Sequence, residues 1–242
     1  MFLDAHIHIG GVFSIFTTQF KKDYLLSLMD SMNISFAFVT SISSSLHHNL
    51  YLANEISKSK GRLFGFYWVN PKRSTILNEI SNVLNYGFVG LKFRAETDNY
   101  SMFNISLIEP ILDYASKMNL LVYIHCSNSG VSHPYFLRDL CSLYPELKII
   151  AGHMAQGSID LINIAMDFDN IFLETSVCYD VKIIEYALRK LGADRILFGS
   201  DYPYSNMYRE IAKILSLKIP LEDKLKILRF NSLSLLPSKY PL

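Results

Sequence analysis

The stretch FLDAHIHI, residues 2–9, combines a polar and an apolar face within one predicted strand. Side chains alternate between the two faces of a strand, so Asp4, His6 and His8 share one face. The other face is wholly apolar, which suits packing against helices. Seven more short runs rich in β-branched and aromatic residues follow, near 34–42, 62–70, 88–94, 120–127, 148–154, 171–177 and 195–201. The sequence therefore predicts eight strands.

Between these runs lie segments whose apolar residues recur every three or four positions, which predicts amphipathic helices. Clear cases cover residues 20–33, 73–86 and 179–192, and a last helix over 221–235 closes the chain. In segment 104–119, Pro110 predicts that the helix starts near this residue. Strands that alternate strictly with helices are typical of a parallel sheet, because parallel neighbours need a crossover.

Eight strand–helix units in 242 residues predict an α/β fold, a (β/α)₈ TIM barrel that forms a single domain over residues 1–242. A doubly wound open sheet is the competing architecture. Its usual sign is a G-x-G-x-x-G turn after the first strand, and only Gly10-Gly11 stands there. The barrel is therefore the favoured prediction.

Composition excludes several classes of protein. The 23 basic and 22 acidic residues give a net charge of +1, so no global field attracts nucleic acid or an anionic membrane. No apolar run approaches 18 residues and no signal peptide is evident, so we expect no membrane span. Cys126, Cys141 and Cys178 are too scattered for a disulfide framework or a Cys₄ zinc site, which favours a reducing, cytoplasmic setting.

Residues that can bind a metal stand at the carboxyl ends of predicted strands, where barrel enzymes build their sites. They are His6 and His8 on the first strand, His125 on the fifth, His153 on the sixth and Asp201 on the eighth. Each alone has an ordinary reading as a hydrogen-bonded histidine or a turn residue. Together they predict a divalent metal site, because zinc and similar ions accept imidazole nitrogens and carboxylate oxygens. Spacing alone does not separate ligands from their neighbours among these five.

Three further polar residues are predicted to point into the barrel. Arg94 could bind a substrate carboxylate with two hydrogen-bond donors of its guanidinium, or could be a solvated arginine at the end of a strand. Lys92 shares its face and is interpreted as a buried structural or substrate-facing lysine. Glu174 on the seventh strand could contact a ligand histidine or Lys92, although a structural role is favoured. The loops at the strand ends, 10–19, 41–48, 96–104 and 127–134, are short, which predicts an open pocket for a small or medium substrate. In a homo-oligomer, a neighbouring subunit could complete this pocket.

Seven stretches along the whole chain resemble the amidohydrolase superfamily, in its amidohydrolase-2 group, also called aminocarboxymuconate-semialdehyde-decarboxylase-like. They are LDAHIHIG, GFYWVNP, GFVGLKF, LLVYIHCS, YPELKIIAGHM, RILFGSDYP and the closing ILRFNSLSLL. The resemblance is specific for the family and not for a substrate.

The resemblance implies a role for each matching residue. His6, His8, His125 and Asp201 would bind one divalent metal ion, with zinc as the first expectation and manganese as the alternative. Asp201 would also accept a proton from the metal-bound water, and His153 would face that water or the substrate. Two-metal members of the superfamily carry a carboxylated lysine at the end of the fourth strand. We do not expect this modification of Lys92, or a second metal.

The first functional hypothesis is a metal-dependent hydrolase that activates water to cleave an ester, lactone or amide bond in a small, possibly carboxylated molecule. The alternative is a lyase, a metal-dependent decarboxylase or hydratase on the same scaffold. A third hypothesis is a non-catalytic small-molecule binder that keeps the fold. In each case the partner is a small molecule, with no nucleic acid and no membrane.

Overall fold

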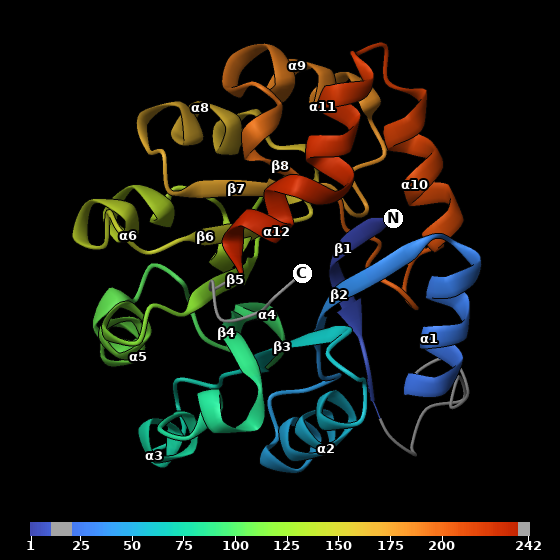
Figure 1. Ribbon diagram of the computed structural model, residues 1–242. Helices are drawn as coiled ribbons and strands as arrows, with labels where there is room; N and C mark the ends of the chain where they lie inside the picture. Colours follow the sequence, from blue (N-terminus) through green and yellow to red (C-terminus); the bar gives the residue numbers. More distant parts are fainter. Residues whose placement is uncertain (11–20, 237–242) are drawn as a thin grey trace.

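A computed structural model describes residues 1–10 and 21–236 of the chain (Figure 1). Eight parallel strands follow one another in chain order: β1 (Phe2–His8), β2 (Ile34–Thr40), β3 (Leu63–Trp68), β4 (Phe88–Phe93), β5 (Leu121–His125), β6 (Ile149–Gly152), β7 (Ile171–Glu174) and β8 (Ile196–Leu197). The last strand returns to the first, because the Ala5 N–H donates to the Phe198 carbonyl and the Asp201 N–H donates to the His6 carbonyl, both at 2.8 Å. The predicted TIM barrel is confirmed. The predicted loop over 10–19 lies, apart from Gly10, outside the described residues.

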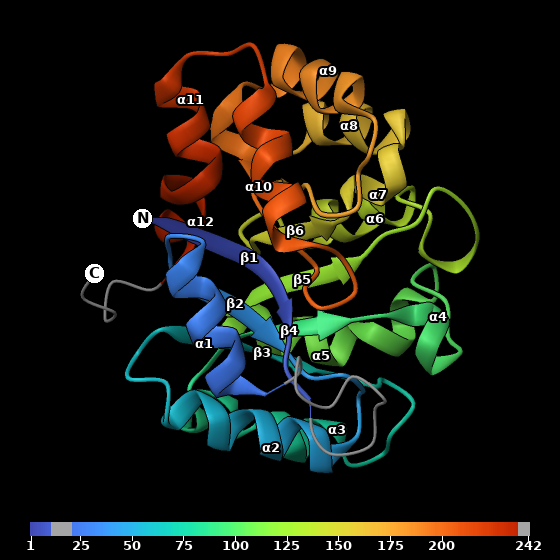
Figure 2. The same cartoon turned by 90° about the vertical axis from the view of Figure 1, so that its right-hand side faces the viewer.

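Helices surround the strands. They are α1 (Lys22–Ser31), α2 (Leu46–Ser57), α3 (Ile76–Ile80), α4 (Ala95–Asp98), α5 (Ile105–Lys117), α6 (Phe136–Leu143), α7 (Met154–Gly157), α8 (Ile159–Asp167), α9 (Val181–Leu191), α10 (Met207–Ser216), α11 (Leu221–Leu225) and α12 (Asn231–Leu235). Figure 2 shows α8 and α9 at the top and α2 and α3 at the bottom, with the strands between them. In the described parts of the chain, no helix combines the length and the hydrophobicity that crossing a membrane requires.

The core has two layers. The larger layer fills the space between the strands and the surrounding helices. The smaller layer fills the barrel with inward side chains such as Leu3, Phe38 and Phe66, and with Leu235 and Leu236 at the carboxyl end of α12. The final helix therefore packs against one end of the barrel, where Figure 1 shows α12 lying over the strands. The polar site described below occupies the opposite end, at the carboxyl termini of the strands.

Two helix predictions were wrong in detail. Helix α5 begins at Ile105 and contains Pro110, because the proline lies on its exposed side while Ile108 and Leu112 are buried. One lost backbone hydrogen bond is outweighed by burial of that apolar stripe. The predicted helix over 73–86 is broken into α3 and a 3₁₀ turn at Val83–Tyr86. At the break, the Ser81 hydroxyl donates to the Asn78 carbonyl at 2.7 Å, a local bond of the kind that competes with a helix.

Candidate active site

A pocket of about 300 Å³ opens at the carboxyl ends of the strands. It is lined by His6, His8, Lys92, Arg94, His125, His153, Asp201 and Tyr204. The structure therefore brings together every residue that the sequence singled out for the site except Glu174, and it adds Tyr204. Strands far apart in the sequence supply these side chains because the barrel aligns the carboxyl ends of all its strands around one mouth.

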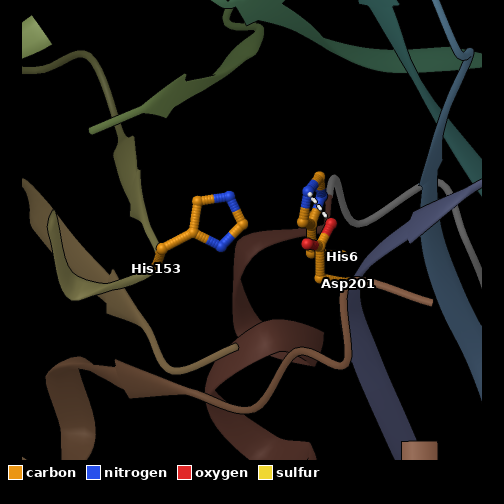
Figure 3. A group of neighbouring side chains, drawn as sticks. All are labelled: His6, His153 and Asp201. Carbon is orange, nitrogen blue, oxygen red and sulfur yellow. Dashed lines mark ion pairs between the residues drawn. The ribbon is translucent and has the colours of Figure 1, made fainter. Parts of the chain in front are cut away.

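The possible metal ligands lie close to one another. The Nε2 atoms of His6 and His8 lie 3.3 and 3.2 Å from Asp201 Oδ1. Ligand atoms of His6, His153 and Asp201 all lie within 4.8 Å of one another, with the His153 ring facing the other two (Figure 3). The rings of His125 and His153 are 4.7 Å apart between centroids. Which histidines complete the ligand set beside Asp201 stays a prediction.

The surroundings of His8 fit a cation. Its Nδ1 lies 3.0 Å from the Ser41 carbonyl oxygen, which can only accept a hydrogen bond, so Nδ1 carries the proton. In the neutral ring Nε2 then carries a lone pair, and this lone pair faces the Asp201 oxygen. Two acceptors at that distance repel each other unless a positive charge lies between them. Burial lowers the pKa of His8, so a metal ion satisfies this contact better than a second proton.

Burial sets the charge of the other ligand candidates. It lowers the pKa of His6 and His125, and it lowers the pKa of His153 to about 4, so all three imidazoles are neutral at pH 7 and have a nitrogen lone pair. Burial raises the pKa of Asp201, and the contacts with His6 and His8 lower it by more, which requires positive charge on the imidazole side of each contact; with neutral rings, a bound metal ion would supply that charge. Neutral imidazoles beside a carboxylate are the ligand chemistry of zinc and manganese sites.

The backbone holds these ligands at strand ends. Asp4 Oδ1 accepts hydrogen bonds from the His6 N–H at 3.0 Å and the Ser200 N–H at 2.9 Å, which ties the strand of His6 to the residue before Asp201. His153 and Asp201 themselves have φ of 60° and 53°, in the left-handed region. Both residues turn out of the strand direction there. Strand β6 ends at Gly152, directly before His153, which explains why this strand ends earlier than the sequence predicted.

A cationic side, whose charge comes from Arg94, faces the ligands. Lys92 is buried, with Nζ 3.5 Å from His6 Nε2 and 3.7 Å from the centre of the Tyr123 ring. Burial, and next the charge of Arg94, lower the pKa of this lysine well below its usual value. The Arg94 guanidinium lies 5.8 Å from the Trp68 ring, and within residues 1–10 and 21–236 no carboxylate forms an ion pair with it. Its charge is therefore available to an anion in the pocket.

Glu174 lies behind the pocket wall instead of lining it. It is fully buried, and its Oε2 accepts hydrogen bonds from the Tyr123 hydroxyl at 2.8 Å and from the His153 N–H at 3.1 Å. Lys92 instead directs its Nζ at His6 and the Tyr123 ring. The histidine that Glu174 contacts is His153, through its backbone N–H, and not one of the predicted metal ligands.

Sequence reasoning missed two aromatic residues of the site. Tyr204 lines the pocket, and its ring centre lies 4.9 Å from that of His8. Tyr123 stacks on His6 at 4.3 Å between ring centres. A signal existed for Tyr123, which lies two positions before His125 and therefore on the same face of its strand. None existed for Tyr204, because it follows the strand in a loop.

Comparison with known protein families finds one that matches most of the chain. The family model described as amidohydrolase, of the amidohydrolase-2 group, matches residues 18–237. The chain belongs to this family. The resemblance seen in the sequence motifs is confirmed.

Relatives in the amidohydrolase family include both lyases and a hydrolase. A 4-sulfomuconolactone hydrolase of Rhizobium radiobacter is 22% identical over 236 residues, covering 85% of this chain and 76% of the relative. A gamma-resorcylate decarboxylase of a Rhizobium species is 26% identical over 240 residues, covering 76% and 73%. A dihydroxybenzoic acid decarboxylase structure from a Polaromonas species, with bound manganese and 2-nitroresorcinol, has a TM-score of 0.78 and 18% identity, covering 97% of this chain and 96% of the other. At this identity the last likeness concerns the fold.

Proposed function

We propose that this member of the amidohydrolase family is a metal-dependent lyase that decarboxylates a small hydroxylated aromatic acid. The observation that carries the proposal is the Arg94 guanidinium, which no carboxylate of the described residues neutralises, beside a group of metal-ligating side chains in a small pocket. A volume of about 300 Å³ is at the small end for ligand pockets and suits a single ring. The relatives support the lyase, which sequence analysis ranked second to hydrolysis, because the gamma-resorcylate decarboxylases predominate among them.

Each polar residue then has a role. His6, His8, His125 and Asp201 would hold one divalent ion, manganese or zinc, which supplies Lewis-acid polarisation of a substrate oxygen when it is bound. Arg94 orients the substrate through a charge-assisted contact with an acidic group. In decarboxylation the bond between the ring carbon and the carboxylate breaks, carbon dioxide leaves, and the ring carbon keeps the electron pair and takes up a proton. Asp201 and His153 face each other across the pocket and are the groups that move this proton (Figure 3).

Lactone hydrolysis is the second candidate. It is favoured by the position of Asp201 in the pocket, where this carboxylate could accept a proton from water, and by the lactone hydrolase among the relatives. Both reactions use the same metal ligands and the same cationic side of the pocket. They differ in whether carbon dioxide is released or water is added.

One panel separates these functions. The purified chain, loaded with manganese or zinc, is incubated with hydroxybenzoates on one side and with lactones and aryl esters on the other, and carbon dioxide release and ring or ester cleavage are measured. Asp201→Asn is the matched control, because it keeps the shape of the side chain and removes its charge. Carbon dioxide release that this variant loses supports the lyase. Hydrolysis alone supports the second candidate, and identical, inactive wild-type and variant proteins would favour the non-catalytic binder.

A further inference from the structure

A buried hydrogen-bond network lies behind His153, on the side away from the pocket. We infer that Glu174 and Ser176 are positioning residues that fix the tautomer of His153, with the proton on Nδ1 and the lone pair of Nε2 directed into the pocket. This goes beyond the roles assigned to the pocket residues above, and it follows from the direction of each hydrogen bond.

Glu174 receives four donors. The Tyr123 hydroxyl, the His153 N–H and the Ser176 hydroxyl donate to its Oε2 at 2.8, 3.1 and 2.9 Å, and the Ser176 N–H donates to its Oε1. A carboxylate accepts all four, whereas a carboxylic acid would direct its own proton at one of these donors. The network therefore suits an ionised Glu174, fully enclosed by its partners.

The orientation of the Ser176 hydroxyl decides the tautomer. Its oxygen lies 2.8 Å from His153 Nδ1, and its single proton is already donated to Glu174. The oxygen can then only accept from the ring, so Nδ1 carries the proton. In the opposite tautomer the hydroxyl proton would turn toward Nδ1, and the buried carboxylate would lose one of its four donors. The ring therefore settles in the tautomer that leaves every acceptor of Glu174 satisfied, since a buried charge that loses a donor is penalised strongly.

The surrounding sequence makes room for this network. A Cβ atom at Gly199 would overlap the Glu174 carboxylate, and one at Gly152 would overlap the Tyr123 hydroxyl. Both residues stand at strand ends beside the site, and neither has a φ that requires glycine. Their lack of a side chain is explained by the space that Glu174 and Tyr123 occupy.

The fixed tautomer determines what His153 can do. With a lone pair on Nε2, the ring accepts a proton from the pocket or ligates an ion, and it donates a proton only after gaining one. When the ring is protonated, the negative charge of Glu174 lies 3.8 Å from Nδ1 and stabilises it. The consequence for turnover rests on the proposed function, whereas the tautomer does not.

Nitrogen NMR of the protein labelled with ¹⁵N-histidine tests the inference directly. Spectra are recorded without metal and with zinc, which is diamagnetic, and a His153→Asn variant assigns the His153 signals. We expect a protonated Nδ1 and an unprotonated Nε2 in both states. In Ser176→Ala the fraction protonated at Nδ1 falls. Thr175→Val is the matched control, because the neighbouring Thr175 hydroxyl is buried and makes no hydrogen bond within the described part of the chain, and this variant should leave the tautomer unchanged.

Turnover gives a second readout. Ser176→Ala should lower kcat about 10- to 100-fold with little change in KM, as loss of a supporting contact behind a site residue does, and Ser176→Thr should restore it. A wild-type His153 protonated at Nε2, or a tautomer that Ser176→Ala leaves unchanged, would overturn the inference. A wild-type protein inactive on every substrate of the panel would refute the proposed function, and the tautomer measured by NMR would still support or overturn the inference.

Discussion

The turn that follows β6, labelled α7, has a left-handed backbone, which leads to a prediction about the stability of the protein. His153, Met154, Ala155 and Gln156 have φ of 60°, 47°, 48° and 56°, so four consecutive residues with side chains adopt the left-handed conformation. This conformation costs roughly 1–2 kcal/mol for each non-glycine residue, because Cβ crowds the following carbonyl oxygen. The turn carries His153 into the pocket, so the strain lies at the proposed site.

Replacing Gln156 with glycine should relieve part of this strain. The Gln156 side chain is exposed, so little packing is lost. The gain of about 1–2 kcal/mol is offset by about 0.4–1 kcal/mol for the greater freedom of glycine in the unfolded chain. The midpoints of these ranges give a net stabilisation of about 0.8 kcal/mol, which corresponds to a rise in Tm of about 2–3 °C for a chain of this length.

Thermal and urea unfolding, followed by circular dichroism, measure the effect. Asn163→Gly is the matched control, since Asn163 is an exposed amide residue in the right-handed helix α8, where the change from asparagine to glycine destabilises by about 0.3 kcal/mol. The two substitutions should therefore have opposite signs. A Gln156→Gly variant that is destabilised as much as the control would refute the strained turn.

Three further predictions concern the pocket and the residues around it. Arg94→Met should raise KM for an anionic substrate about 10- to 100-fold and change kcat less, as measured by steady-state kinetics, because a charged hydrogen bond is worth about 1.5–3 kcal/mol. The pKa of His153 is about 4 in the folded protein against 6.5 for an unperturbed histidine, which means that the unfolded chain binds more protons between these values. The free energy of unfolding of the metal-free protein should therefore fall as pH drops from about 6.5 to 4, and His153→Gln should reduce the slope by up to about 1.4 kcal/mol per pH unit in urea titrations. Asp98→Ala removes the acceptor 2.9 Å from the Trp68 indole nitrogen, so the fluorescence of this single tryptophan should shift and stability should fall by about 1–3 kcal/mol. An unchanged emission spectrum would contradict the role of this contact.

The parts of the fold that follow from a repeating pattern were predictable. Alternation of strand and helix identified the barrel, and the parity of His6 and His8 placed both on the inner face. The exceptions are local. Whether α5 can continue through Pro110 depends on which side of the helix faces solvent. That side is decided by how the helix packs against the rest of the protein and not by the proline itself.

The parts of the site that escaped prediction depend on hydrogen-bond direction and on backbone turns. The Ser41 carbonyl beside His8 and the Ser176 hydroxyl beside His153 follow different strands from the histidines that they contact. No local sequence pattern therefore predicts these contacts. Glu174 was correctly placed inward by parity, but parity does not show that the chain turns at Ser176 and brings its N–H and hydroxyl back to this carboxylate.

The charges in the pocket restrict the choice of substrate more than the shape of the pocket does. Arg94 is positive and Asp201 negative, while burial keeps the histidines neutral and disfavours a charge on Lys92. A bound divalent ion therefore leaves an excess of about two positive charges, and uncompensated charge in a buried site is costly. A substrate that brings two acidic groups, such as a carboxylate next to an ionisable hydroxyl, compensates this excess, whereas a neutral aryl ester does not. In the substrate panel, neutral esters should consequently be poor substrates under either proposed reaction, and a neutral ester cleaved faster than every acid would show that Arg94 and the metal site do not act together on the substrate.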